Sequence, residues 1–363
     1  MTNHSPQRGV GRPPVQQEAV REELRQRILH GTWAPGCRLP SRLDLVRELR
    51  TTSSTLQSAL DDLREDGLVV TQGSRGTFVS TQAPHRFHYG ILFPQALQAL
   101  GEGEENLLWK SLHAAVSRYP DAHGRRITEY FGRHWQAESV SYQQLIADCQ
   151  FGRLAGLLIV QPSTMLVGSP LLTAAVPRVF LSSVEAPLGD ARIHIDGGSF
   201  RRSAIQRLSA GGCKQVAVIA GAGAYCAQST EVQAWLAELA AAGISSRESW
   251  MLCGDILYAA SITNTVRLLM ERCDHQPDGI VVADDNLLPG VIAGLQAEGL
   301  SVGRDVQVIA HANFPLTVAN PAGVVRIGLD TQRVIADGIR YCEAIHAGEQ
   351  PLSHLIVPLD KTP

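Results

Sequence analysis

Three helix-like segments and an alternating hairpin, packed into residues 20–80, constrain the fold of this chain more than any other feature. Val20, Leu24 and Ile28 recur at the spacing of an amphipathic helix. Gly31 and a Pro-Gly pair follow and end that segment. The first helix is therefore short and buries one face.

A second helix is expected to begin at Ser41. Ser41 and Asp44 have the spacing at which a hydroxyl and a carboxylate satisfy the first backbone donors of a helix. The apolar residues Leu43, Val46 and Leu49 are then expected to face inward.

A third helix and a hairpin complete the region. Hydroxyl side chains over 51–55 can cap the helix, in which Leu56, Leu60 and Leu63 share one face. The apolar period changes to two at Leu68, and a glycine-bounded turn at 73–76 reverses the chain. The region predicts three helices and a two-stranded wing.

This framework resembles the winged helix-turn-helix of GntR regulators, at Gly31, Pro35, Gly36, Leu39, Pro40, Ser41, Ala59, Leu60, Leu63, Gly67, Leu68, Gly76, Thr77, Phe78 and Val79. In that family the third helix enters the major groove of DNA and the wing tip reaches the minor groove. The resemblance implies contacts to double-stranded operator DNA by Arg42, Thr52, Ser53, Ser54, Thr55, Gln57, Gly73 and Arg75.

The chain departs from that family in its recognition chemistry. Leu43 replaces a usual arginine of the second helix, and Ser53 and Gln57 stand where many relatives have arginine. We therefore expect readout through hydroxyls, an amide and DNA shape. The alternative for the Ser and Thr residues is a purely structural helix cap, and for Arg75 a solvated side chain.

Charge points to a pair of modules. The first 80 residues hold 11 arginines, no lysine and 9 acidic residues, a net charge of +2, and the rest of the chain carries −5. Because so small a charge neutralises few phosphates, tight binding needs a homodimer on a two-fold operator. We expect a disordered polar tail at 1–14 and a DNA-binding domain at 15–80.

A second domain must follow. The chain has 363 residues, 44% of them hydrophobic and 18% charged, which implies a large core. The polar segment 81–86 is the expected linker, and 87–363 the second domain. His85 and His88 have no other ligands nearby in sequence, so no metal is expected. Seven cysteines without a CxxC pair, and no apolar run of about 18 residues, favour a reduced, cytoplasmic protein that does not enter a membrane.

Beyond residue 87, short apolar runs alternate with helical ones, as in parallel sheets buried on both faces. Strands are expected at 89–93, 127–131, 156–160, 178–181, 193–195, 215–220, 249–253, 279–283 and 306–310, and helices at 198–210, 229–242, 260–272, 287–298 and 331–346. This is too many strands for one ordinary sheet and indicates two packed lobes.

Two parts of this domain resemble LacI-type effector domains. They are IHIDGG at 193–198 with LSAGGCKQVAVIAG at 208–221, and PDGIVVADD at 277–285 with GLSVGRDVQVI at 299–309. The resemblance implies an α/β fold with a winged helix-turn-helix and a two-lobed, Rossmann-like, periplasmic-binding-protein-like domain. A small molecule is then expected in the inter-lobe cleft. Dimer contacts from 106–119 and release of DNA on ligand binding are also implied, with corepression left open.

The ligand candidates lie at the expected strand ends. Sugar-binding relatives often have an arginine near the position of Glu231 and an aspartate next to the position of Asn313, while Asp284 replaces their asparagine. Asp284 and Asn313 are the better candidates, and Gln161, Glu231 and Asp255 the weaker ones. A sugar, a polyol or an amine would suit a cleft with these changes. The alternative for each side chain is a loop cap.

An enzyme is the alternative from another class. The segment VAVIAGAGAYC at 216–226 approaches a dinucleotide-binding fingerprint, which would suit an NAD-type enzyme. However, the last glycine is missing and no acidic residue follows about 20 residues on. The second domain has only Lys110, Lys214 and Lys361, none placed for a pyridoxal phosphate Schiff base. We therefore predict a ligand-responsive transcription regulator, a repressor, without enzymatic activity or cofactor.

Overall fold

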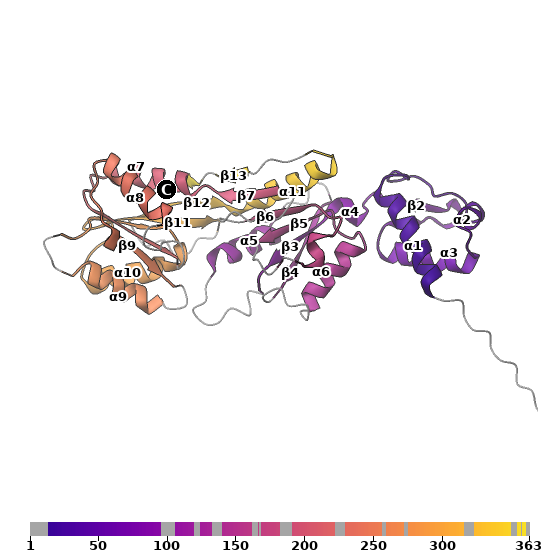
Figure 1. Ribbon diagram of the computed structural model, residues 1–363, viewed down its shortest axis with the longest axis horizontal. Coiled ribbons are helices and arrows are strands. Elements are labelled where there is room, and N and C mark those ends of the chain that lie inside the picture. Colours follow the sequence, from indigo (N-terminus) through magenta and orange to yellow (C-terminus); the bar gives the residue numbers. More distant parts are fainter. Residues whose placement is uncertain are drawn as a thin grey trace, which may run out of the picture.

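A computed structural model describes the chain over residues 14–95, 106–119, 124–132, 140–161, 166, 168–181, 191–221, 229–255, 259–271, 275–315, 323–349, 354–356 and 358–360. A small helical module, a first α/β lobe and a second α/β lobe follow one another along its long axis (Figure 1). The predicted fold class is confirmed.

The N-terminal module has the predicted three helices and wing. Its elements are α1 (Pro14–Leu29), α2 (Arg42–Glu48), α3 (Ser53–Glu65), β1 (Val69–Thr71), the 3-10 turn η1 (Gly73–Arg75) and β2 (Thr77–Val79). The two strands pair antiparallel. The predicted inner faces of α1 and α3 are buried together in one hydrophobic cluster.

Two details of the module differ from the prediction. Leu43 is 69% exposed, and Leu45 takes the buried position. The reason is that α2 has only seven residues, so its inner face holds Leu45 with Val46 and Leu49 at its edge. Helix α1 begins at Pro14, within the expected tail, because proline suits the first turn of a helix. Residues 1–13 lie outside the described part of the chain.

The expected linker at 81–86 is partly helical. A single turn, α4 (Pro84–Phe87), occupies its second half and leads directly into the first lobe. Proline suits the first turn of a helix because its missing N–H is not needed there. The module therefore stands on a short, structured connection.

The first lobe is a parallel six-stranded sheet in the order β13-β7-β6-β5-β3-β4. Its strands are β3 (His88–Phe93), β4 (Arg126–Phe131), β5 (Gly156–Val160), β6 (Arg178–Leu181), β7 (Ala191–Ile195) and β13 (His354–Ile356). Its helices are α5 (Leu107–Ser117), α6 (Val140–Gln150), η5 (Pro170–Leu172) and α11 (Thr331–His346).

The second lobe repeats this plan with the order β14-β12-β11-β10-β8-β9. Its strands are β8 (Val216–Gly221), β9 (Met251–Gly254), β10 (Gly279–Val282), β11 (Gln307–Phe314), β12 (Val324–Asp330) and β14 (Leu359–Asp360), with β14 antiparallel to β12. Its helices are α7 (Gly197–Ala210), α8 (Thr230–Ala241), η6 (Glu248–Trp250), α9 (Ala259–Leu269), η8 (Asp285–Leu287) and α10 (Leu288–Ala297).

Most expected strands and helices of the two lobes are confirmed to within a few residues. Strand β12 was not predicted, because Arg326 and Gly328 interrupt its apolar run. Strand β11 continues to Phe314, so Asn313 lies inside the strand and not after it. The extension is stabilised by pairing with the unpredicted β12 as far as Asp330.

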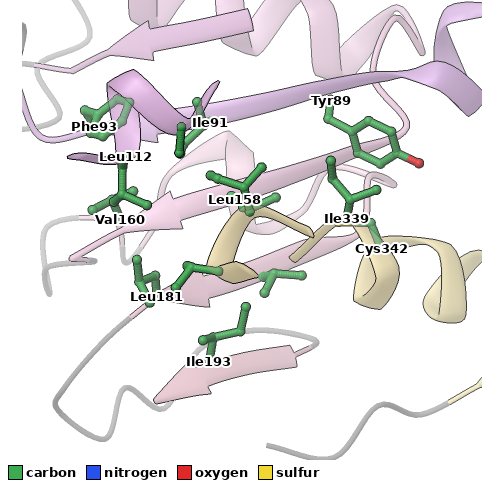
Figure 2. Packing of buried hydrophobic residues seen from close by; sticks show 14 of the residues in the cluster. Tyr89, Ile91, Phe93, Leu112, Leu158, Val160, Leu181, Ile193, Ile339 and Cys342 are labelled. Atoms are coloured by element: carbon green, nitrogen blue, oxygen red, sulfur yellow. The ribbon is translucent and has the colours of Figure 1, made fainter. Parts of the chain in front are cut away.

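The chain crosses between the lobes after β7, between β12 and α11, and between β13 and β14. As a result, α11 packs on the first lobe although it follows a strand of the second. Its residues Ile339 and Cys342 lie against Leu158 and Tyr89 in the core of the first lobe (Figure 2). The two lobes are therefore mutually dependent parts of one domain.

Two further properties hold for the described residues. No helix among them is long and apolar enough to span a membrane. No group of three or more His, Cys, Asp and Glu side chains among them could hold a metal ion.

Candidate DNA-binding surface and effector site

The N-terminus of α3 presents hydroxyl groups in two different situations. The Thr52 hydroxyl caps the helix, accepting from the backbone N–H of Thr55 at 3.2 Å, and lies 2.9 Å from the Thr55 hydroxyl and 3.0 Å from that of Ser54. Ser53 and Ser54 are exposed. Thr52 and Thr55 thus serve the cap, whereas Ser53 and Ser54 stand at the positive end of the helix dipole, where phosphate oxygens are favoured.

Gln57 is held along the same helix. Its Nε2 donates to Oδ2 of Asp61 at 3.0 Å, and Asp61 also forms an ion pair with Arg64 at 3.1 Å. The Gln57 amide is therefore oriented by Asp61. To read an adenine it must exchange the Asp61 carboxylate for the base edge.

Arginines surround the entry to α2 and the wing. Arg42 is the exposed first residue of α2, and Gly73 and Arg75 form the exposed turn η1 at the wing tip. Arg38, which the sequence analysis missed, lies against Gly76 so closely that a Cβ there would come within 2.8 Å of its Nε. A hollow of about 350 Å³ is lined by both Arg38 and Arg42. The position of Arg38 directly before Leu39-Pro40-Ser41 could have indicated it.

Adjacent aspartates at the carboxyl end of β10 have separate partners. Oδ1 of Asp284 accepts from the backbone N–H of Asn286 at 3.0 Å and from its Nδ2 at 2.7 Å, so it caps η8. Burial raises the pKa of Asp284, and the bonds from Asn286 oppose that shift. Its Oδ2 points toward Gly221. Asp284 thus combines the loop-cap role with one oxygen free of the cap.

Asp285 is the centre of a buried polar cluster, and the sequence analysis did not single it out. Its two carboxylate oxygens accept from Nδ2 of Asn313 at 3.0 and 3.1 Å. Nδ1 of His311 lies 3.8 Å away and Nη2 of Arg326 lies 4.0 Å away. Burial lowers the pKa of Arg326, partly offset by the charge of Asp285. We call Asp285, His311, Asn313 and Arg326 the Asp285 cluster.

Two polar atoms of the Asp285 cluster lack a hydrogen-bond partner. They are Oδ1 of Asn313 and Nη1 of Arg326, and both side chains are more than nine-tenths buried. Buried polar groups are almost always paired, so a free acceptor and a free donor in one buried cluster mark a candidate binding site. No sequence signal could have found Arg326, because it lies on the unpredicted β12.

The remaining ligand candidates are dispersed. Gln161 follows β5 of the first lobe, and its Oε1 accepts from Nε1 of Trp109 at 2.8 Å. Glu231 forms an ion pair with Arg201 at 2.6 Å on α8. Asp255 follows β9. The structure thus places Asn313 against Asp285, which is next to the predicted Asp284. Glu231 is paired with Arg201 and does not join them. Of the dinucleotide-like segment 216–226, residues 222–226 lie outside the described part.

The two lobes touch beside the Asp285 cluster. Oδ1 of Asn286 accepts from the backbone N–H of Leu107 at 2.9 Å, and the Ser111 hydroxyl donates to the carbonyl of Asn313 at 2.9 Å. Helix α5 of the first lobe therefore contacts the carboxyl ends of β10 and β11. The larger described cavity, of about 1010 Å³, lies elsewhere, between the module and the first lobe.

Fold and sites together define a winged helix-turn-helix joined to a periplasmic-binding-protein-like domain. Residues 16–79 match the profile of "Bacterial regulatory proteins, gntR family", and residues 205–355 that of a "Periplasmic binding protein-like domain". The chain thus combines a GntR DNA-binding domain with a LacI-type effector domain, as the sequence predicted.

Individual relatives match parts of the chain. Catabolite control protein A of Priestia megaterium is 30% identical over 148 residues, which are 40% of this chain and 44% of that protein. A histidine utilization repressor of Pseudomonas putida is 39% identical over 74 residues, 20% of this chain and 29% of that protein. The chain therefore spans less than half the length of each of these two relatives.

Solved structures extend the likeness of fold. A LacI-family regulatory protein from Chloroflexus aggregans superposes with a TM-score of 0.61 at 17% identity, covering 76% of this chain and 96% of that one. The transcriptional regulator CelR in complex with cellobiose superposes with a TM-score of 0.58 at 18% identity, covering 96% of this chain and 98% of that one. These identities support the fold alone.

Proposed function

We propose that the protein is a cytoplasmic transcription regulator, a repressor, that binds two-fold operator DNA as a homodimer and responds to a small molecule held between its lobes. The observation that carries the proposal is the GntR-type α3, whose N-terminus presents Ser53 and Ser54 to solvent, attached to a two-lobed effector domain. Regulators are also what the names of the similar proteins describe.

The homodimer is proposed to pair through the first lobe. Segment 106–119 contains α5, whose inner residues Leu107, Leu112 and Ala115 pack in the core. Its exposed positions Ser117 and Arg118 are available to a partner subunit. Two modules would double the phosphate contacts that one module of charge +2 can make.

A neutral polyhydroxyl compound, a sugar or a polyol, is the proposed ligand class. The free Oδ1 of Asn313 accepts a hydrogen bond and the free Nη1 of Arg326 donates one, and a hydroxyl can do both. Asp285 and Arg326 carry opposite charges that offset each other within the cluster. The regulator CelR, of similar fold, is described in complex with cellobiose.

DNA binding is tested by selecting, from a library of random DNA duplexes, the sequences that the full-length protein binds. The proposal expects enrichment of a sequence with two-fold symmetry. Fluorescence anisotropy on the selected duplex should then show a steep loss of affinity with salt, since phosphate contacts dominate. Failure to enrich any sequence would contradict the proposed function.

Ligand binding is tested by thermal shift with a panel of sugars, polyols and amines. A true ligand at 100 times its dissociation constant adds about 2.7 kcal/mol to stability. Asp284→Ala should leave DNA binding intact and abolish release of DNA by that ligand, because Oδ2 is proposed to contact the ligand only when the lobes close around it. Asp305→Ala removes an exposed carboxylate and should respond like wild type. If Asp284→Ala still releases DNA at the ligand concentration that acts on wild type, Asp284 only caps η8 and does not contact the ligand.

A further inference from the structure

One buried carboxylate connects the DNA-binding module to the first lobe. Asp66, at the C-cap of α3, accepts from Nη2 of Arg25 on α1 at 2.9 Å. Its other oxygen accepts from Nη2 and Nε of Arg153, a residue of the first lobe, at 2.5 and 2.9 Å. Arg153 also donates to Asp148 on α6 at 3.1 Å. We call these four residues the Asp66 cluster.

The Asp66 cluster is largely buried, and its hydrogen bonds depend on the orientation of the side chains. The side chains of Arg25 and Asp66 are 1% and 6% exposed, while that of Arg153 is 34% exposed. Charge-assisted bonds of this kind are short and depend strongly on angle, above all when one carboxylate is shared by two guanidinium groups. Asp148 is itself held by the Tyr130 hydroxyl at 2.7 Å, which ties the cluster to β4.

The turn that carries Arg153 also packs against the module. Phe151 lies with its ring centroid 5.1 Å from the guanidinium carbons of Arg21 and Arg153 and 5.0 Å from that of Arg25. Gly152 has a φ of +63°, and the Leu29 side chain occupies the space where its Cβ would be. These contacts lie on one side of the joint.

The other side of the joint is not filled by side chains. The cavity of about 1010 Å³ there is bordered by the end of α1, the connection through α4, the turn at η5 and the end of α11. This cavity is partly open to solvent, so the module and the lobe are not packed against each other over this region. The angle at which the module sits on the first lobe is therefore set by the Asp66 cluster and its Phe151 turn, and not by a continuous packed interface.

We infer that Arg153 is a positioning residue that determines which spacing between operator half-sites the protein accepts. The inference rests on the proposed function, that is, on a dimer with one module per half-site. Each base pair added between half-sites moves them apart by about 3.4 Å and rotates them by about 35° around the duplex. If Arg153 fixes the orientation of each module, the dimer can bind half-sites at one spacing only. If the modules were free to rotate on their connections, the dimer would bind half-sites at several spacings.

The variant Arg153→Met tests the inference in the full-length protein. It removes the donors of Arg153 while leaving the Arg25–Asp66 pair, so the module keeps its own buried ion pair and its fold. Arg304→Met is the matched control, because Arg304 is exposed on the second lobe and pairs with its neighbour Asp305. Both proteins are compared with wild type on duplexes derived from the selected operator, with one half-site, with both at the selected spacing, and with the spacing changed by two base pairs.

Wild type and Arg304→Met should lose affinity at least about tenfold when the spacing changes, which is the scale of one mismatched contact. Arg153→Met should show a ratio below about threefold with an unchanged affinity for the single half-site. Trypsin cleavage after the exposed Arg86 in the connection should also be faster in Arg153→Met than in the control, because a detached module leaves α4 without support.

The outcomes separate the two proposals. Failure of the library to yield any operator contradicts the proposed function. An operator whose spacing ratio is unchanged in Arg153→Met contradicts the inference alone, as does an equal loss on the single half-site, which would make Arg153 a residue of module stability. Unchanged cleavage after Arg86 would likewise show that the Asp66 cluster does not hold the module in place.

Discussion

Replacing Asp285 by alanine should destabilise the second lobe far more than the same change at its neighbour Asp284. Asp285→Ala leaves the Asn313 amide without its acceptor and the buried Arg326 guanidinium without a counter-charge. Breaking a buried charge pair by removing one partner costs about 3 to 5 kcal/mol. Asp284→Ala removes the side-chain cap of η8, for which about 1 kcal/mol is expected.

The measurement is urea unfolding of the full chain, followed by the fluorescence of tryptophans that include the buried Trp235 on α8. The difference of about 3 kcal/mol between the two variants corresponds to a ratio of about 100 in the unfolding constant. Asp285→Asn should recover part of the loss, since its amide oxygen still accepts from Asn313, while Asp305→Ala should change stability by less than about 1 kcal/mol. Equal losses for Asp284→Ala and Asp285→Ala would refute the assignment of Asp285 as the centre of the cluster.

Three further outcomes are expected. Arg75→Ala should weaken operator binding without loss of stability, because the side chain is exposed at the wing tip, and an unchanged affinity at moderate salt would remove it from the surface. Gln57→Ala should reduce discrimination between operator and random DNA, and equal losses on both would leave Gln57 as a backbone contact. Burial lowers the pKa of His88 from 6.5 to about 4, so the unfolded state alone takes up this proton as the pH falls below 6.5. The contribution of His88 to stability should therefore decline by about 1.4 kcal/mol per unit between pH 6.5 and 4. His88→Gln should remove that contribution in urea titrations, while the similar contribution of His85, whose pKa burial also lowers to about 4, should remain.

Local patterns predicted most of the fold. Helix α11 and strands β5 and β6 have the predicted bounds, because uninterrupted periodicity and clear caps or turns frame them. Strand β12 was missed because Arg326 and Gly328 break its run, yet its pairing with β11 places Asn313 inside a strand. Long-range pairing of this kind leaves no mark in a short window of sequence.

The candidate sites were predictable only where a local pattern indicates them. Ser53 and Ser54 follow from a cap motif, so their exposure at the start of α3 could be expected. The Asp285 cluster combines residues of η8, β11 and β12, and only the fold shows that Asp285, and not Asp284, faces Asn313. The pairing of Asp66 with Arg153 spans 87 positions and two domains, beyond the reach of any local pattern.

The late position of α11 in the chain has a consequence for synthesis. A growing polypeptide completes the winged module first, while the first lobe waits for the side chains of α11 and for β13, which follow nearly the whole second lobe in sequence. On the ribosome the proposed DNA-binding surface therefore forms before the proposed effector domain is complete. A chain interrupted after Asp330 would contain the complete winged module, but its first lobe would lack α11 and β13.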